Sequence, residues 1–174
     1  EDRAYKNADY VLSNLKNSYE HMQNRGMNPE KFAWVPNGFL KEEVEGATPL
    51  EQHTLDQLPK DKFIIGYAGT LGIANALDSF VKAASQLKDY SDIAFVLVGQ
   101  GKLKSALQQQ VADLNLNNVY FVDPIPKKQV QSLLQHFDVC YIGLTKDPLF
   151  RFGVSPNKLF DYLLHNKKWK KLHN

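Results

Sequence analysis

Lys158 stands where the first turn of a helix normally carries a carboxylate. Residues 153–164, "GVSPNKLFDYLL", run from a polar turn into an apolar helical pattern. Ser155 is a typical N-cap residue and Pro156 suits the first helical position, and a capping box would then place Glu or Gln at the position that Lys158 occupies. Because a cation is unfavourable at the positive end of a helix, two interpretations stay open. Either the helix N-terminus and Lys158 hold a phosphate, or Lys158 points into water or pairs with Asp161.

Three glycine-bearing turns each follow an expected strand. They are "GYAGTLG" with Gly69, Thr70 and Gly72, "VGQGK" with Gly99 and Gly101, and "GVSPNK" with Val154, Ser155 and Lys158. Glycine lets backbone N–H groups approach a phosphate, and open parallel sheets bind ligands outside the carboxyl ends of their strands. Neither of the first two turns has the dinucleotide G-x-G-x-x-G spacing, and a glycine after a strand is commonly structural. Three such turns at one sheet edge nevertheless favour a phosphate site.

The remaining polar residues predict no metal site and no nucleophilic catalyst. Asp161 suits the hydroxyl pair of a ribose or sugar, or is simply a surface carboxylate. The spacing of His21, His136 and His165 to one another and to Cys140 matches no metal-ligand pattern, and no Ser-His-Asp set is evident. Cys140 lies in an apolar run, which predicts a buried, reduced thiol and fits a cytosolic compartment.

These residues need a layered sheet to position them. Apolar runs rich in β-branched or aromatic residues predict strands at 10–13, 32–36, 63–69, 93–99, 119–122 and 138–144. Helical patterns with a period of 3.6 residues fall at 75–88, 102–114 and 127–136. Alternating strands and helices with short connections predict an α/β fold, namely a Rossmann-like parallel sheet with helices on both faces.

Composition excludes several classes of function. The chain of 174 residues is 43% apolar and 23% charged, which is ordinary for a globular protein. A net charge of +2 without a basic stripe argues against nucleic acid as a partner. The most apolar window is broken by glycines and is shorter than the ~20 residues of a membrane span. The basic stretch 167–171, "KKWKK", either touches an anionic membrane surface or is a solvated end.

Two boundaries divide the chain into three expected parts. The turn "VPNGF" and the polar stretch 41–61, which is read as a long connection, separate a strand–helix–strand piece at 1–36 from a larger domain at 37–166. Residues 167–174 form a basic tail. Fewer strand–helix units follow than a doubly wound sheet usually has, so we expect the chain to be truncated.

The motifs together resemble a known enzyme family. "VPNGF", "FIIGYAGTLGIANALDSFVKAA", "FVLVGQGKLKSAL", "NNVYFVDPIPKKQV" and "SPNKLFDYLL" occur in this order. The chain resembles retaining glycosyltransferases of the GT-B class, family 4 (group 1), in the branch of capsule and O-antigen enzymes that includes fucosamine-type transferases. The resemblance implies two Rossmann-like domains with a nucleotide sugar between them. Residues 1–36 would end the acceptor domain, and residues 37–166 would form the donor-binding domain.

The resemblance also implies a role for each candidate residue. Gly69, Thr70 and Gly72 would line the diphosphate side of the donor site. Gly99 and Gly101, with Pro124 and Ile125 of the "DPIPK" turn, would face the nucleobase and ribose. The backbone of Val154 and Ser155 would meet the diphosphate together with Lys158, and Asp161 aligns with a glutamate that binds ribose hydroxyls. No catalytic residue, metal ion or cofactor is assigned.

Three positions depart from the family pattern. Gly153 stands in place of a glutamate, Thr70 in place of an arginine and Asn75 in place of a lysine. Since two phosphate-binding cations are missing, Lys158 becomes the main candidate cation. Most of the acceptor domain is missing as well, so we expect this chain to be inactive by itself.

The expected function is donor binding in a retaining transferase. The donor would be a UDP-linked or other nucleoside-diphosphate sugar, and the acceptor a saccharide or lipid-linked saccharide of surface polysaccharides such as capsule or lipopolysaccharide. We expect a cytoplasmic protein, with peripheral contact at the inner membrane face in a full-length enzyme. Two alternatives stay open: a sugar-nucleotide 2-epimerase, and a non-catalytic flavodoxin-like interaction module.

Overall fold

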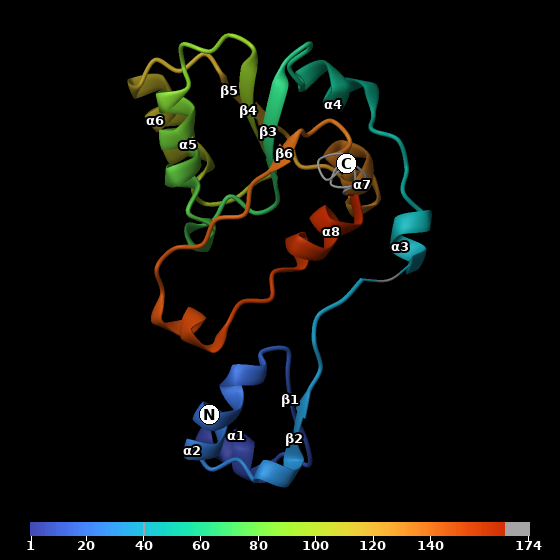
Figure 1. Cartoon of the computed structure of the whole chain (residues 1–174), viewed down its shortest axis with the longest axis vertical. Helices are drawn as coiled ribbons and strands as arrows, with labels where there is room; N and C mark the ends of the chain where they lie inside the picture. Colours follow the sequence, from blue (N-terminus) through green and yellow to red (C-terminus); the bar gives the residue numbers. More distant parts are fainter. Residues whose placement is uncertain (40, 166–174) are drawn as a thin grey trace, which may run out of the picture. The chain divides into compact units, whose positions relative to one another are not determined.

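The computed structural model describes residues 1–39 and 41–165 and contains parallel sheets flanked by helices (Figure 1). The strands are β1 (Val11–Ser13), β2 (Phe32–Trp34), β3 (Phe63–Ala68), β4 (Ile93–Val98), β5 (Val119–Val122) and β6 (Val139–Cys140). The helices are α1 (Asp2–Asn7), α2 (Tyr19–Asn24), α3 (Lys41–Glu45), α4 (Gln52–Gln57), α5 (Leu77–Gln86), α6 (Lys104–Asp113), α7 (Val130–Leu134) and α8 (Asn157–His165). The expected basic tail at 167–174 lies outside the described residues. Among the helices described, none has the length and apolarity needed to cross a membrane.

The chain divides into two compact units. The first contains Glu1–Phe39 and Lys146–Phe160, and the second contains the described residues 41–145 and 161–165. The segment 146–160, which the sequence assigns to the donor domain, therefore groups with the N-terminal piece. The division into an acceptor part at 1–36 and a donor part at 37–166 stays a prediction.

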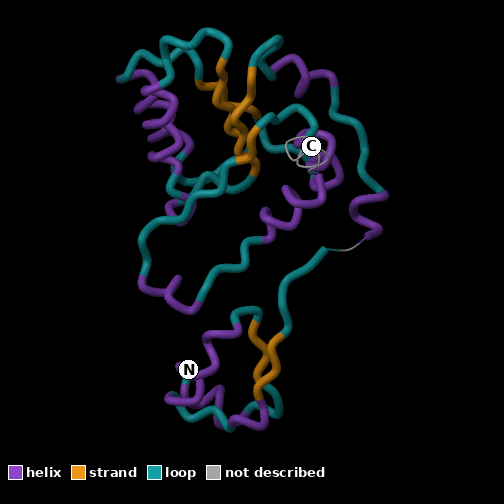
Figure 2. Tube along the Cα trace, viewed as in Figure 1, coloured by secondary structure: helices purple, strands orange, loops and turns teal. Residues whose placement is uncertain are grey.

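The second unit is built on a four-stranded parallel sheet in the order β5-β4-β3-β6. Strands are orange in Figure 2. β3 and β4 pair along their whole length, from Phe63 opposite Ile93 to Ala68 opposite Val98. Because each parallel strand must return through a crossover, α5 connects β3 to β4 and α6 connects β4 to β5. The predicted α/β fold with a parallel sheet is confirmed.

Helices cover both faces of this sheet. Phe95 and Leu97 of β4 pack with Phe80 of α5 in one apolar cluster. The alternate residues Val96 and Val98 pack in a second cluster, which includes residues of α7. Figure 1 shows α5 and α6 on one side of the strands and α7 on the other. This alternation explains why the β4 sequence is apolar at nearly every position.

Two parts of the second unit differ from the sequence-based expectation. The run 138–144 contributes only the two residues of β6, because β6 pairs with β3 alone, at the edge of the sheet. The polar stretch 41–61 is a connection, as expected, but it contains α3 and α4. In α4 the side chain of Thr54 is buried. Leu58, the first residue after α4, belongs to the second apolar cluster.

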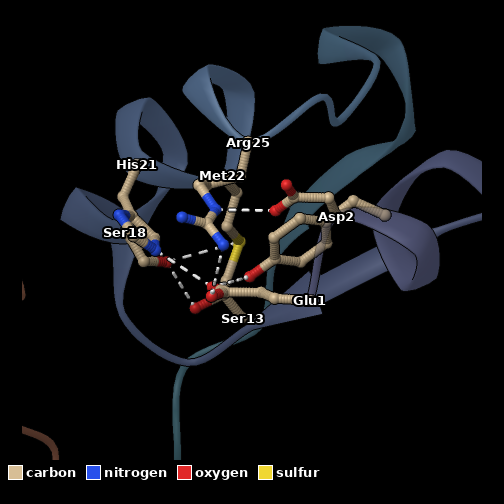
Figure 3. Close-up of polar contacts among 8 residues, drawn as sticks. Glu1, Asp2, Ser13, Ser18, His21, Met22 and Arg25 are labelled. Atoms are coloured by element: carbon tan, nitrogen blue, oxygen red, sulfur yellow. Dashed lines mark hydrogen bonds and ion pairs between the residues drawn. The ribbon is translucent and has the colours of Figure 1, made fainter.

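The first unit has a small parallel sheet in which β1 pairs with β2. An ion pair and a hydrogen bond join α2 and the residue after it to the chain start: Arg25 Nε lies 2.6 Å from Asp2 Oδ1, and His21 Nε2 lies 3.0 Å from Glu1 Oε1 (Figure 3). Hydrogen bonds from His21 and Tyr5 lower the pKa of the Glu1 carboxyl below its usual value. These contacts join the start of α1 to α2.

Candidate functional site

The first two glycine turns meet at the carboxyl edge of the parallel sheet. The Gly69 N–H donates to the Val98 carbonyl at 2.9 Å. Leu71, which is fully buried, donates its N–H to the Gln100 carbonyl at 2.9 Å and accepts at its own carbonyl from the Leu103 N–H at 3.0 Å. The backbone of each turn therefore holds the other in place.

Close packing of these turns explains two of their glycines. Gly99 has a φ of +140°, and a Cβ there would overlap the Gly69 carbonyl oxygen. A Cβ at Gly101 would lie 2.7 Å from the backbone C and N atoms of Leu71. At Gly72, by contrast, a Cβ would meet only ordinary contacts, the nearest being Thr70 Cγ2 at 3.7 Å. Close packing thus explains why Gly99 and Gly101 are glycines, but it gives no reason for glycine at position 72.

Side-chain hydrogen bonds hold the backbone of the first glycine turn and of the residues after it. The hydroxyl of Tyr67 donates to the Thr70 carbonyl at 2.7 Å, and Asn75 Nδ2 donates to the same oxygen at 3.0 Å. The Tyr141 hydroxyl donates to the Ala76 carbonyl at 2.9 Å. Burial raises the pKa of Tyr67 to about 12, so this hydroxyl keeps its proton at neutral pH. Thr70 itself is exposed at the end of the strand.

The "DPIPK" turn adjoins the second glycine turn. Gly99 donates its N–H to the Val122 carbonyl at 3.2 Å, at the end of β5. Pro124 is exposed, and Ile125 is partly buried against the second apolar cluster. The structure thus brings seven of the sequence-predicted residues to one sheet edge: Gly69, Thr70, Gly72, Gly99, Gly101, Pro124 and Ile125.

A lysine that the sequence analysis missed lies at the same edge. Lys104 begins α6, and its Nζ is 3.3 Å from Asp123 Oδ1 of the "DPIPK" turn. Its side chain is only 18% exposed, whereas that of Asp123 is 68% exposed. The signal in the sequence was a second lysine two residues after the lysine of "VGQGK", at the start of a helical pattern.

The third glycine turn lies in the first unit, with the beginning of α8. The helix begins at Asn157 rather than at Pro156, so the expected N-cap position of Ser155 is wrong by one residue. The Ser155 carbonyl instead accepts a hydrogen bond from Asn37 Nδ2 at 2.7 Å. Lys158 remains in the first turn, where burial lowers the pKa of its ammonium group. Val154, which directly precedes Ser155, is exposed.

The structure explains one departure from the family pattern. Gly153 has a φ of +100°, directly after the 3₁₀ helix Pro148–Phe152. A glutamate with this backbone would be strained, because L side chains rarely adopt it. Asp161 lies further along α8, in the part that groups with the second unit, and is partly buried.

The described residues offer little for metal or thiol chemistry. Within 1–39 and 41–165, no group of three or more His, Cys, Asp or Glu side chains is arranged to hold a metal ion. Cys140 is a free, partly buried thiol, and burial raises its pKa to about 11. It is therefore protonated at neutral pH; the sequence predicted a buried thiol, and the structure shows a partly buried one.

A surface hollow of about 490 Å³ lies in the first unit. Its lining residues are distant in sequence from the predicted donor-site residues. It is lined by Lys16, Asn17, Tyr19, Glu20 and Phe32. The rings of Tyr19 and Phe32 meet edge to face, with centroids 5.1 Å apart. No motif in the sequence pointed to this hollow.

Comparison with known proteins gives a family match over more than half of the chain. Residues 51–149 match the family described as "Glycosyl transferases group 1". The chain is 26% identical over 161 residues to WcaI of Escherichia coli, a candidate colanic acid biosynthesis glycosyl transferase. The match covers 90% of this chain and 39% of WcaI.

A second curated relative is an N-acetylgalactosaminyltransferase of Campylobacter jejuni. Its full name is N-acetylgalactosamine-N,N'-diacetylbacillosaminyl-diphospho-undecaprenol 4-alpha-N-acetylgalactosaminyltransferase. The two are 33% identical over 113 residues, which is 64% of this chain and 29% of that protein. The chain therefore spans well under half the length of the curated relatives that it matches.

The fold also matches a solved structure. Anabaena Alr3699/HepE in complex with UDP-glucose superposes with a TM-score of 0.69 at 18% sequence identity. The superposition covers 93% of this chain and 44% of that one. At this level of identity the likeness concerns the fold, and it agrees with the parallel sheet and its flanking helices.

Proposed function

Since the chain belongs to the group 1 glycosyl transferases, we propose that it is the donor-binding part of a retaining glycosyltransferase. The donor is a nucleoside-diphosphate sugar, and UDP is the nucleotide. The observation that carries the proposal is the meeting of two glycine turns and the "DPIPK" turn at the carboxyl edge of a parallel sheet. Open α/β sheets bind nucleotides at this edge.

Each candidate residue has a place in this proposal. Gly69, Thr70 and Gly72 contact the diphosphate side of the donor, and Gly99, Gly101, Pro124 and Ile125 contact the nucleoside. Val154, Ser155 and Lys158 bind the diphosphate, and Asp161 accepts hydrogen bonds from hydroxyl groups of the ribose. The first N–H groups of a helix lack acceptors within it, which favours an anion at the start of α8, where the Leu159 N–H already donates to the Pro156 carbonyl at 3.0 Å.

The proposed chemistry depends on stabilising the departing diphosphate. The bond between the sugar C1 and the diphosphate oxygen breaks, and an acceptor hydroxyl oxygen bonds to C1 on the same face. A phosphate oxygen of the donor takes the hydroxyl proton. Lys158 and the positive end of α8 offset the charge that grows on the leaving group. This reaction needs no metal ion or other cofactor.

The acceptor is a saccharide or a lipid-linked saccharide of a surface polysaccharide, in the fucosamine-type branch of the family. The support is that WcaI is a candidate colanic acid biosynthesis glycosyl transferase and that the name of the Campylobacter jejuni relative includes a diphospho-undecaprenol-linked saccharide. We place the protein in the cytoplasm, with its full-length form in peripheral contact with the inner membrane face.

A calorimetric titration panel with UDP, GDP and ADP tests the proposal. We expect saturable binding of UDP and weaker binding of the other two nucleotides. Tighter binding of GDP or ADP than of UDP would contradict the assignment of uridine. Failure to bind any of the three would contradict the donor site and favour a non-catalytic interaction module. For the epimerase alternative, conversion of a UDP-linked sugar by a full-length protein without any acceptor would be the supporting result.

Replacing Gly72 by alanine separates a ligand role from a packing role. The new methyl group meets only ordinary contacts, so the free energy of unfolding should change by less than about 1 kcal/mol. If the diphosphate approaches this backbone, the same methyl group should weaken UDP binding about threefold or more. Denaturant unfolding and calorimetry measure the two quantities, and unchanged UDP affinity would remove Gly72 from the site.

A further inference from the structure

Asn37 makes a hydrogen bond across 118 residues of sequence to the turn that precedes α8. Its Nδ2 donates to the Ser155 carbonyl at 2.7 Å, and both residues are partly buried. Both residues lie in the first unit: Asn37 is in the "VPNGF" turn, and Ser155 is in the segment 146–160. The contact therefore joins two chain segments that folding must bring together.

A second contact holds the segment 146–160 within the first unit. The rings of His21 and Phe152 lie with their centroids 5.1 Å apart, and within the segment itself the Arg151 guanidinium lies 4.6 Å from the Phe152 ring centroid. Arg151 and Phe152 belong to the 3₁₀ helix Pro148–Phe152, ahead of the glycine turn. The Asn37 contact lies further along the segment, at the Ser155 carbonyl two residues before α8.

The position of that peptide gives the contact its consequence. Pro156 has no N–H, so the peptide group between Ser155 and Pro156 can form a hydrogen bond only through its carbonyl oxygen. The amide of Asn37 binds this oxygen and so fixes the plane of the peptide. That plane sets the direction of the chain entering α8, and with it the direction of the first helical N–H groups and of Lys158.

We propose that Asn37 is a positioning residue for the diphosphate of the donor, acting through the Ser155 carbonyl. It holds the start of α8 in the orientation that binds the anion. The inference rests on the proposed function, because it assigns the diphosphate to this turn. It adds a residue from the N-terminal part of the chain that no motif of the donor site contains.

The test compares UDP with uridine as ligands of the full chain. Asn37→Ala removes the side-chain N–H group that donates the hydrogen bond. Asn37→Asp keeps the shape of the side chain but replaces its amide by a carboxylate, which cannot donate. We expect Asn37→Ala to weaken UDP binding about three- to tenfold, as the loss of one neutral hydrogen bond implies, and Asn37→Asp to weaken it more. Uridine lacks the diphosphate, so its affinity should stay the same in both variants.

A matched control is Asn28→Ala. The Asn28 side chain accepts a hydrogen bond from the Glu30 N–H at 3.1 Å and caps the 3₁₀ helix Pro29–Lys31 in the same unit. It should leave the ratio of UDP to uridine affinity unchanged. If that ratio also stays unchanged in both Asn37 variants while the unmodified chain binds UDP, Asn37 is only structural and the inference is wrong. If the unmodified chain does not bind UDP, the proposed function fails and this inference fails with it.

Discussion

Replacing Lys158 by methionine is expected to weaken UDP binding about ten- to a hundredfold and to leave the fold intact. A hydrogen bond between a charged lysine and a phosphate contributes about 1.5–3 kcal/mol, which corresponds to this loss. The resemblance implies two other cations where this chain has Thr70 and Asn75, so the proposed site gives Lys158 more of this role. Calorimetry with UDP measures the loss.

The control for Lys158 is Lys88→Met. Lys88 is an exposed lysine after α5, and its replacement changes the net charge by the same amount. UDP affinity should change less than twofold in this control. A Lys158→Met variant that binds UDP as tightly as the unmodified chain would exclude Lys158 from the diphosphate site.

The lowered pKa of Lys158 gives this prediction a pH dependence. Burial lowers the pKa in the folded chain below the value of 10.5 for an exposed lysine. UDP binding that needs the cation should therefore weaken as the pH rises through this lowered pKa, before an exposed lysine would lose its proton. The unfolded chain binds the extra proton between the two pKa values, so the free energy of unfolding rises over that window. At neutral pH the buried charge is destabilising, and Lys158→Met should make the ligand-free chain slightly more stable.

Replacing Gly99 by alanine is expected to lower the free energy of unfolding by about 2–6 kcal/mol. The backbone at Gly99 has a φ of +140°, which costs an alanine roughly 1–3 kcal/mol of strain. Its Cβ would also overlap the Gly69 carbonyl, and relieving such overpacking costs typically ~1–3 kcal/mol more. The sum is a large part of the ~5–15 kcal/mol that stabilises an ordinary domain. Denaturant unfolding monitored by circular dichroism measures the change.

Gly38→Ala is the matched control for Gly99→Ala. A Cβ at Gly38 would meet nothing within 4 Å, and its backbone is not in the left-handed region. We expect this variant to change the free energy of unfolding by less than about 1 kcal/mol. Equal stabilities of the Gly99 and Gly38 variants would mean that the two glycine turns do not pack as described.

Much of the second unit could be predicted from its sequence because burial on both faces leaves a clear pattern. The apolar run of β4 and the 3.6-residue period of α5 each mark an element that packs in the core. β6 was harder, since Tyr141 continues the apolar run but donates its hydroxyl to the Ala76 carbonyl at the start of α5. α4 was missed because its sequence is mostly polar, and only Thr54 within it is buried.

The candidate site was predictable where glycines mark the turns, and less so where distant residues meet. A glycine after a strand shows where the chain turns, but the packing of Gly99 against Gly69 appears only in the fold. The Ser155 carbonyl was expected near an N-cap, and its actual partner is 118 residues away. Local patterns carry no information about such a pairing.

An amide-resolved NMR titration of the ¹⁵N-labelled chain with UDP tests the central claim most directly. We expect saturable shifts at the amides of Gly69, Gly72, Gly99 and Gly101, and at Lys158 in the first turn of α8. Uridine should reproduce the shifts at Gly99 and Gly101 but not those at Lys158. The absence of shifts at these residues, or shifts confined to the hollow lined by Tyr19 and Phe32, would contradict the proposed donor site.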